Sequence, residues 1–251
     1  MHSIRTPRSA FPAAALLAAF ALLSGCAGNP VGPGGVTSVN APAPPKVGDQ
    51  WAYEVSSGYS RTSKGILRQR VVEASASGIV IESSGFQEGR ATIMPDLQWL
   101  THPLGDDSVK AFSPAYPALV FPLTAGQRWN VKVDGRVIQP QPLGGGGSTD
   151  RVTIQGKVLG WERVKVPAGE FDVIHIRRVT FGGNFDDRSF GQSEITEELW
   201  YAPSIGRVVR STSSWQRLMS WVQRGSEKYM LGDLTIMELL PPGEPRAALA
   251  Q

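Results

Sequence analysis

Few side chains in this sequence belong to the types that carry catalysis or bind metals. The 251-residue chain has three histidines and one cysteine. His102 lies in a stretch bounded by prolines, and His175 lies within an apolar strand pattern, Val173–Ile176. A lone histidine in a strand is usually a packed or surface residue, and a metal site needs further ligands. The sequence therefore predicts no metal site and no cofactor.

Adjacent acids are the other candidates for chemistry, at Asp106–Asp107, Asp186–Asp187 and Glu197–Glu198. Neighbouring residues of a strand point to opposite faces, so Glu197 and Glu198 cannot act together from one regular strand. The chain also lacks a Gly-x-Ser-x-Gly elbow, a Walker loop and a dinucleotide fingerprint. We predict no catalytic residue and no enzyme. A hydrolase whose triad is defined by geometry alone is the third-ranked alternative.

The single cysteine, Cys26, has the position and neighbours of a lipid attachment site. An apolar run over 10–23 follows two arginines and has the length of a secretory signal. Leu23-Ser24-Gly25-Cys26 then resembles the lipobox of bacterial lipoproteins, whose cysteine receives a diacylglyceryl group before cleavage and acylation of the new amine. A buried or idle thiol is the alternative. The resemblance implies a lasting membrane tether, and Ala27 in place of Asp implies the outer membrane.

Removal of the signal changes the charge balance. It takes away two arginines and no acid, so the formal net charge falls from 25 − 22 = +3 to 23 − 22 = +1. Basic and acidic residues are interleaved without a block of like charge. The sequence therefore predicts no nucleic-acid partner. The expected partners are the membrane, reached through the N-terminal lipid, and either a lipid or another envelope protein.

Composition divides the chain into four segments. Residues 1–25 are predicted as the lipoprotein signal peptide, and 26–46 as the lipidated cysteine with a flexible linker rich in proline and glycine. Such a linker has too little apolar surface to offset its ordering entropy. Fully extended, the 20 residues from Ala27 to Lys46 would reach roughly 60–70 Å. A β-rich domain is expected over 47–240, and a flexible tail over 241–251.

The domain shows short runs with period-two alternation, separated by glycines and prolines. We predict a mainly β fold, either an antiparallel curved sheet or a half-open barrel, with two β lobes as an alternative. The proline-rich stretch Pro95–Pro122 is expected to be a long excursion from the sheet. The expected strands are Trp51–Ser56, Gly65–Ala74, Ile79–Ser83, Arg90–Met94, Arg128–Val133, Arg151–Leu159, Glu162–Val166, Phe171–Phe181, Ile195–Tyr201, Arg207–Ser214, Ser220–Gly225 and Leu234–Leu240.

A short pattern, Gly-x-x-Trp, occurs at Gly48–Trp51 and again at Gly126–Trp129. Each tryptophan is followed four residues later by valine, Val55 or Val133. The pattern indicates a turn at glycine that opens a strand whose tryptophan enters the core. Coincidence is the alternative in a chain with 28 glycines. Duplication of a β lobe is one interpretation, although repeat proteins usually show stronger self-similarity.

Two hairpin turns are also predicted, with no role beyond turn formation. Pro167 presets φ for a turn, and Gly169 can take the left-handed conformation that completes a three-residue loop. The second turn follows Trp200-Tyr201 and contains Pro203 and Gly206.

These motifs together resemble a family of Gram-negative envelope proteins of unknown function, many of them exported proteins or predicted lipoproteins. The resemblance rests on Gly-x-x-Trp, Gly160-Trp161-Glu162, 164–171 and 200–208, and it covers about 47–240. It implies an architecture similar to the LolA/LolB-like curved sheets, in which a half-closed barrel surrounds an apolar cavity. It brings no catalytic residues.

Four tryptophans in predicted strands are candidates for either core packing or a ligand wall. They are Trp51, Trp129, Trp161 and Trp200. We predict an outer-membrane lipoprotein whose periplasm-facing β domain binds or handles an apolar or envelope component without catalysis. The alternative is an accessory protein that binds another envelope protein through a sheet edge.

Overall fold

The protein is described from a computed structural model, which covers residues 29–105, 108–138, 149–182, 193–219 and 228–243. Cys26, the expected strand Ser220–Gly225 and the pair Asp186–Asp187 lie outside these residues. The described residues form a short 3₁₀ turn and fourteen strands. Their bounds are η1 (Pro33–Gly35), β1 (Ser38–Val39), β2 (Gln50–Ser57), β3 (Ser63–Ser75), β4 (Gly78–Gly85), β5 (Gly89–Ile93), β6 (Trp99–Gly105), β7 (Ser108–Tyr116), β8 (Leu123–Thr124), β9 (Arg128–Ile138), β10 (Thr149–Val166), β11 (Gly169–Gly182), β12 (Ser193–Ala202), β13 (Arg207–Met219) and β14 (Lys228–Leu239).

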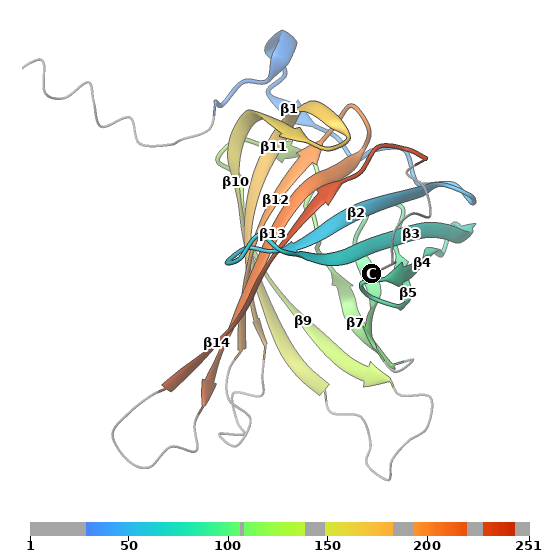
Figure 1. The fold of residues 1–251 in the computed structure, drawn as a ribbon, viewed down its shortest axis with the longest axis vertical. Coiled ribbons are helices and arrows are strands. Elements are labelled where there is room, and N and C mark those ends of the chain that lie inside the picture. Colours follow the sequence, from blue (N-terminus) through green and yellow to red (C-terminus); the bar gives the residue numbers. More distant parts are fainter. Residues whose placement is uncertain (1–28, 106–107, 139–148, 183–192, 220–227, 244–251) are drawn as a thin grey trace, which may run out of the picture.

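Twelve strands form one closed antiparallel barrel (Figure 1) in the order β10-β11-β12-β13-β14-β2-β3-β4-β5-β6-β7-β9. The remaining strands, β1 and β8, form a separate pair. The predicted antiparallel, mainly β fold is confirmed. The sheet closes into one barrel instead of staying half-open or dividing into two lobes. The β14–β2 ladder, from Thr235↔Ser57 to Leu239↔Tyr53, joins the C-terminal strands to the N-terminal ones. Closure pairs backbone groups that would otherwise form a sheet edge, here over Thr235–Leu239 of β14.

The stretch Pro95–Pro122, expected to be an excursion, supplies two barrel strands, β6 and β7. Their pairing is interrupted by register shifts at Trp99/Thr101 and at Pro103/Gly105. Proline lacks the N–H that a regular ladder needs and is tolerated at such irregularities. The same prolines disrupt the alternating sequence pattern, which explains why the strands were not predicted. None of the described residues forms a helix with the length and hydrophobicity needed to span a bilayer.

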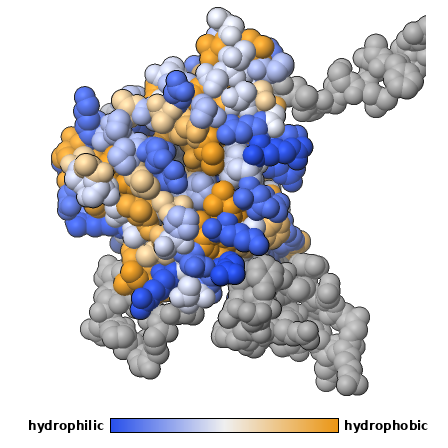
Figure 2. Space-filling view, turned by 180° about the vertical axis from the view of Figure 1, so that it is seen from behind, coloured by the Kyte–Doolittle hydropathy of each residue, from blue (hydrophilic) through white to orange (hydrophobic). Residues whose placement is uncertain are grey.

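Side chains on the long strands alternate between the interior and the outside of the barrel. On β11, Ile176, Arg178 and Thr180 are buried, whereas Arg177 between them is exposed. Figure 2 shows the outer surface on one face, where hydrophilic and hydrophobic residues are interleaved. Apolar clusters fill much of the interior; the largest includes Leu119 and Leu123 from the segment after β7.

The chain from Asn29 to Pro45 lies against the upper end of the barrel as drawn in Figure 1. The Asn29 N–H donates to the Trp161 carbonyl at 3.1 Å, and the Trp161 N–H donates to the Asn29 carbonyl at 2.7 Å. Further along, β1 pairs with β8, and Val39 is buried in the same cluster as Trp161. This part of the predicted linker segment is therefore held on the barrel by backbone pairing and apolar burial.

The two Gly-x-x-Trp segments have the same local structure. Gly48 and Gly126 have φ values of +93° and +82°, in the left-handed region that glycine favours. The Gly48 N–H donates to the Val71 carbonyl at 3.0 Å, and the Gly126 N–H donates to the Val158 carbonyl at 2.9 Å. In return, the Val71 N–H donates to the Asp49 carbonyl and the Val158 N–H donates to the Gln127 carbonyl, both at 2.9 Å.

The equivalence continues into the strands that follow each turn. The strands β3 and β10 each have a register shift just after the paired valine, at Val71/Glu73 and at Val158/Gly160. Val55 and Val133, four residues after the two tryptophans, are both almost fully buried. The barrel therefore contains the same turn and strand unit twice, once in β2–β4 and once in β9–β11.

Candidate functional site: a cavity inside the barrel

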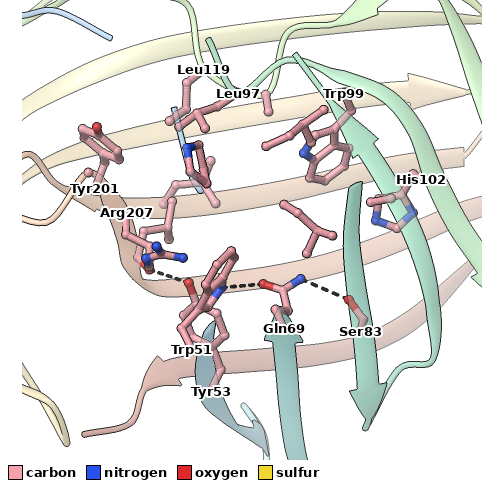
Figure 3. Close-up of a pocket in the computed structure, with 18 of the residues that line it drawn as sticks. Trp51, Tyr53, Gln69, Ser83, Leu97, Trp99, His102, Leu119, Tyr201 and Arg207 are labelled. Atoms are coloured by element: carbon pink, nitrogen blue, oxygen red, sulfur yellow. Dashed lines mark hydrogen bonds between the residues drawn. The ribbon is translucent and has the colours of Figure 1, made fainter. Parts of the chain in front are cut away.

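A cavity of about 230 Å³ lies inside the barrel (Figure 3). Its walls come mainly from β2–β6 and from the β12–β13 hairpin, and most of its lining is apolar. The apolar wall includes Tyr53, Ile81, Ile93, Leu97, Trp99 and Leu119. Cavities of this kind, apolar with a few placed polar groups, are the usual form of a small-molecule site.

One wall carries a chain of hydrogen bonds across three strands. The Trp51 Nε1–H donates to Gln69 Oε1 at 2.7 Å, and Gln69 Nε2–H donates to Ser83 Oγ at 3.3 Å. Trp51 and Gln69 are direct cross-strand partners on β2 and β3. Figure 3 shows the three side chains in a row along the cavity. The bonds fix the indole so that its ring forms part of the wall.

Arg207, the first residue of β13, provides an unpaired positive charge in this cavity. Its guanidinium lies over the Trp51 ring, 3.5 Å from the centroid, and its side chain is half-buried. Among the described residues, no carboxylate lies within ion-pair distance of it. Burial lowers the pKa of Arg207 below its ordinary value, while Tyr53, Asp49 and Tyr201 oppose the shift. An anionic group bound beside it would relieve this cost.

Two tyrosines beside Arg207 complete this part of the lining. The Tyr53 hydroxyl donates to the Val208 carbonyl at 2.9 Å. The Tyr201 hydroxyl is buried and has no hydrogen-bond partner among the described residues. Burial raises the pKa of each tyrosine to about 12, with Arg207 opposing the shift. Both phenols are therefore neutral near pH 7, and Tyr201 keeps a free O–H donor.

The second arginine of the cavity, Arg178, is fully engaged. Its side chain is almost completely buried; Nε donates to Glu197 Oε2 at 2.8 Å and Nη1 donates to the Ala118 carbonyl at 2.6 Å. Burial alone would lower the pKa of Arg178, but Glu197 and Tyr116 raise it above its ordinary value. Arg178 therefore forms a buried ion pair with Glu197, whereas Arg207 has no carboxylate partner among the described residues.

His102 lines the cavity beside Trp99, with ring centroids 4.6 Å apart. Burial lowers the pKa of His102 and Arg178 adds to the shift, whereas the backbone of Pro103 and the Glu197 carboxylate oppose it. The imidazole is thus neutral at pH 7.

The four predicted tryptophans have different environments. Trp51 lines the cavity and also packs against two apolar clusters, so its role as ligand wall or core stays a prediction. Trp129 and Trp161 pack in the largest apolar cluster, and the indole nitrogens of both are buried without a partner among the described residues. Trp200 stacks on His175 with centroids 4.6 Å apart and donates to Glu162.

His175 belongs to a network on the outside of the barrel. Its Nδ1 lies 3.1 Å from Glu162 Oε1, and its Nε2 contacts Glu198 Oε2. Glu197, the neighbour of Glu198, instead pairs with Arg178 in the interior. The two acids thus point to opposite faces, as predicted. Within the described ranges, no group of His, Cys, Asp and Glu side chains is arranged to hold a metal ion.

The predicted turn residues lie at hairpin ends. Val166 pairs with Gly169, so Pro167 and Ala168 form a two-residue loop instead of the three-residue loop predicted. Gly169 is the first residue of β11 and has a φ of +134°. Pro203 and Gly206 lie in the β12–β13 turn, where Gly206 has a φ of +63°.

A second cavity, of about 590 Å³, shares Trp51, Gln69 and Arg207 with the first. Phe171 and the chain after β14, Leu240–Gly243, add apolar surface to it. Arg207 therefore borders two cavities, the second of which is also lined by the charged side chains Arg68, Arg70 and Glu82. Sequence reasoning identified Trp51 but missed Arg207, Tyr201 and Gln69. Arg207 follows the glycine of a predicted turn, and nothing in that pattern distinguishes it from other strand-end arginines.

No family model and no curated protein matches the chain. Similar solved structures include a predicted exported protein with a YmcC-like fold from Bacteroides fragilis, with 16% identity and a TM-score of 0.46 over 81% of this chain and 98% of that one. The hypothetical lipoprotein YmcC from Escherichia coli is 9% identical, with a TM-score of 0.42 over 77% and 85%. A predicted lipoprotein from Parabacteroides distasonis is 13% identical, with a TM-score of 0.37 over 81% and 98%. These similarities are too low to assign a family or transfer a function, and similarity to LolA/LolB stays a prediction.

Proposed function

We propose that this protein is a lipid-anchored cell-envelope protein that binds a small anionic amphiphile in its barrel without catalysing its conversion. The anchor is the predicted lipidation of Cys26, and the predicted location is the periplasmic side of the outer membrane. Both come from the lipobox-like sequence and from Ala27. The ligand class comes from the cavity.

The observation that carries the proposal is the unpaired guanidinium of Arg207 at an apolar cavity. A half-buried charge without an ion-pair partner loses solvation, and contact with the Trp51 ring does not supply the hydrogen bonds that its N–H groups can make. A carboxylate or phosphate group beside Arg207 would supply charge-assisted hydrogen bonds.

The rest of the lining favours a hydrocarbon portion. Ile81, Leu97 and Trp99 form a wall with few polar groups, and each buried methylene contributes about 0.8 kcal/mol. An alkyl chain whose head group contacts Arg207 can extend along this apolar wall.

Barrel closure weakens the alternative of an accessory protein that binds a partner through a sheet edge. Each of the twelve barrel strands, as far as the structure describes them, pairs with a neighbour on both sides, although the β14–β2 ladder covers only Thr235–Leu239 of β14. Strand addition needs an unpaired edge. An interior ligand is therefore favoured over a partner bound by strand addition.

The test uses the chain without residues 1–26, refolded after delipidation and titrated in native mass spectrometry with a fatty acid and the alcohol of equal chain length. The acid should bind more tightly. Arg207→Gln should weaken binding of the acid by about 10- to 100-fold, because a charged hydrogen bond contributes about 1.5–3 kcal/mol.

The matched control is Arg128→Gln, which removes an exposed arginine from the outside of β9. It should leave both affinities unchanged. Absence of any adduct, or equal weakening of acid and alcohol binding by Arg207→Gln, would contradict the proposed ligand class.

A further inference from the structure

We propose that the upper end of the barrel in Figure 1, formed by the chain from Asn29 to Pro45 and the β12–β13 turn, docks on the bilayer surface. The cavity mouth beside Arg207 would then face the lipid headgroups. This inference rests on the lipid anchor of the proposed function, and it adds an orientation and a contact surface.

The first argument is the length of the tether. Asn29 is joined to Trp161 by two backbone hydrogen bonds. Only Ala27 and Gly28 separate this fixed residue from the predicted acylated Cys26. Three residues extend over about 10 Å, compared with the roughly 60–70 Å of a free 20-residue linker. The barrel around Trp161 must therefore lie close to the headgroups.

The second argument is the position of the cavity relative to that tether. An ideal Cβ built on Gly206 would lie 2.9 Å from the Pro42 side chain, so the N-terminal segment packs directly on the β12–β13 turn. Pro45, at the end of this segment, lines the same cavity as Gly206 and Arg207. The segment that begins at the tether thus reaches the rim of the cavity.

The third argument is the exposed apolar surface at this end. Val31 and Val36 are each 40% exposed, and Ile205 in the β12–β13 turn is 43% exposed. Such side chains can insert at the boundary between headgroups and acyl chains and add to the hold of a lipid anchor. A bilayer is the occupant that fits both the tether and these side chains.

The experiment uses the full, lipidated chain in nanodiscs that contain a headgroup-labelled quencher lipid. Because the sequence has one cysteine and the diacylglyceryl group occupies its sulfur, an introduced cysteine is the sole free thiol for labelling. One variant carries a fluorophore at Ile205→Cys. The other carries it at Ile138→Cys, the last residue of β9, at the opposite end of the barrel, where the native side chain is 49% exposed. Quenching should be several-fold stronger at position 205.

A matched variant carries a 15-residue Gly/Ser insertion between Gly28 and Asn29, and its quenching at position 205 should fall towards that at 138. Equal quenching at both positions without the insertion would overturn docking. An insertion without effect would overturn the tether as its cause. A Cys26→Ser chain that still takes up labelled palmitate and stays on membranes would also overturn the inference. That result would also remove the anchor from the proposed function, but it would leave the ligand affinities of the chain without residues 1–26 untouched, so docking and ligand binding fail separately.

Discussion

The two Gly-x-x-Trp units share a turn but use their tryptophans differently. Trp51 is paired across the strands with Gln69, whose side chain holds the indole upright in the cavity wall. Trp129 is paired with Gly156, and an ideal Cβ on that glycine would lie only 2.0 Å from the indole ring. The missing side chain lets Trp129 lie flat over β10 and fill the core. The cross-strand residue, Gln69 or Gly156, thus accompanies a different placement of the tryptophan, in the cavity wall or against the packed interior.

Replacing each tryptophan with alanine should show this difference most strongly. Trp129→Ala removes a ring packed in the largest apolar cluster and should lower the free energy of unfolding by about 3–5 kcal/mol. Trp51→Ala enlarges an existing cavity and removes one hydrogen bond and one cation–π contact, so a loss of about 1–2 kcal/mol is expected. Chemical denaturation measures both. Equal losses would show that the two rings have the same structural role.

The shared turn should respond equally in the two units, with a smaller effect. Gly48→Ala and Gly126→Ala each place a Cβ in a left-handed conformation, which costs about 1–2 kcal/mol. Nothing lies within 4 Å of either ideal Cβ, so strain in φ is the only expected cost. Gly182→Ala, at a glycine without positive φ, serves as the control and should change stability less. Clearly different losses at Gly48 and Gly126 would contradict the repeated unit.

The smallest expected effect is on the pH dependence of stability, and it concerns His102 in the cavity wall. Because burial lowers the pKa of His102 in the folded state, the unfolded chain binds a proton more readily. The stabilising contribution of neutral His102 is present above the unfolded pKa of about 6.5 and is lost as the pH falls below it. His102→Gln should therefore flatten the decline in stability between about pH 7 and pH 5. His175→Gln, on the outer face, is the comparison; a larger change there would refute the assignment to His102.

The sequence predicted the parts of this comparison that depend on local chemistry. Glycine, tryptophan and valine at fixed spacing identified both turns and the buried Val55 and Val133. The strands β6 and β7 were not predicted, because the prolines at their register shifts hide the alternation. The Arg207 site was not predicted because it exists only when β14 pairs with β2 and the barrel closes. Contacts that distant in sequence leave no local pattern.

The central claim is that Trp51, beside Arg207, contacts a ligand, whereas Trp129 belongs to the core. Its most direct test is the tryptophan emission change on titrating a fatty acid into the delipidated chain and its Trp51→Phe and Trp129→Phe variants. We predict a saturable change in the unmodified chain that is largely lost in Trp51→Phe and retained in Trp129→Phe. A response that survives in Trp51→Phe and disappears in Trp129→Phe, or no response in the unmodified chain, would contradict the claim.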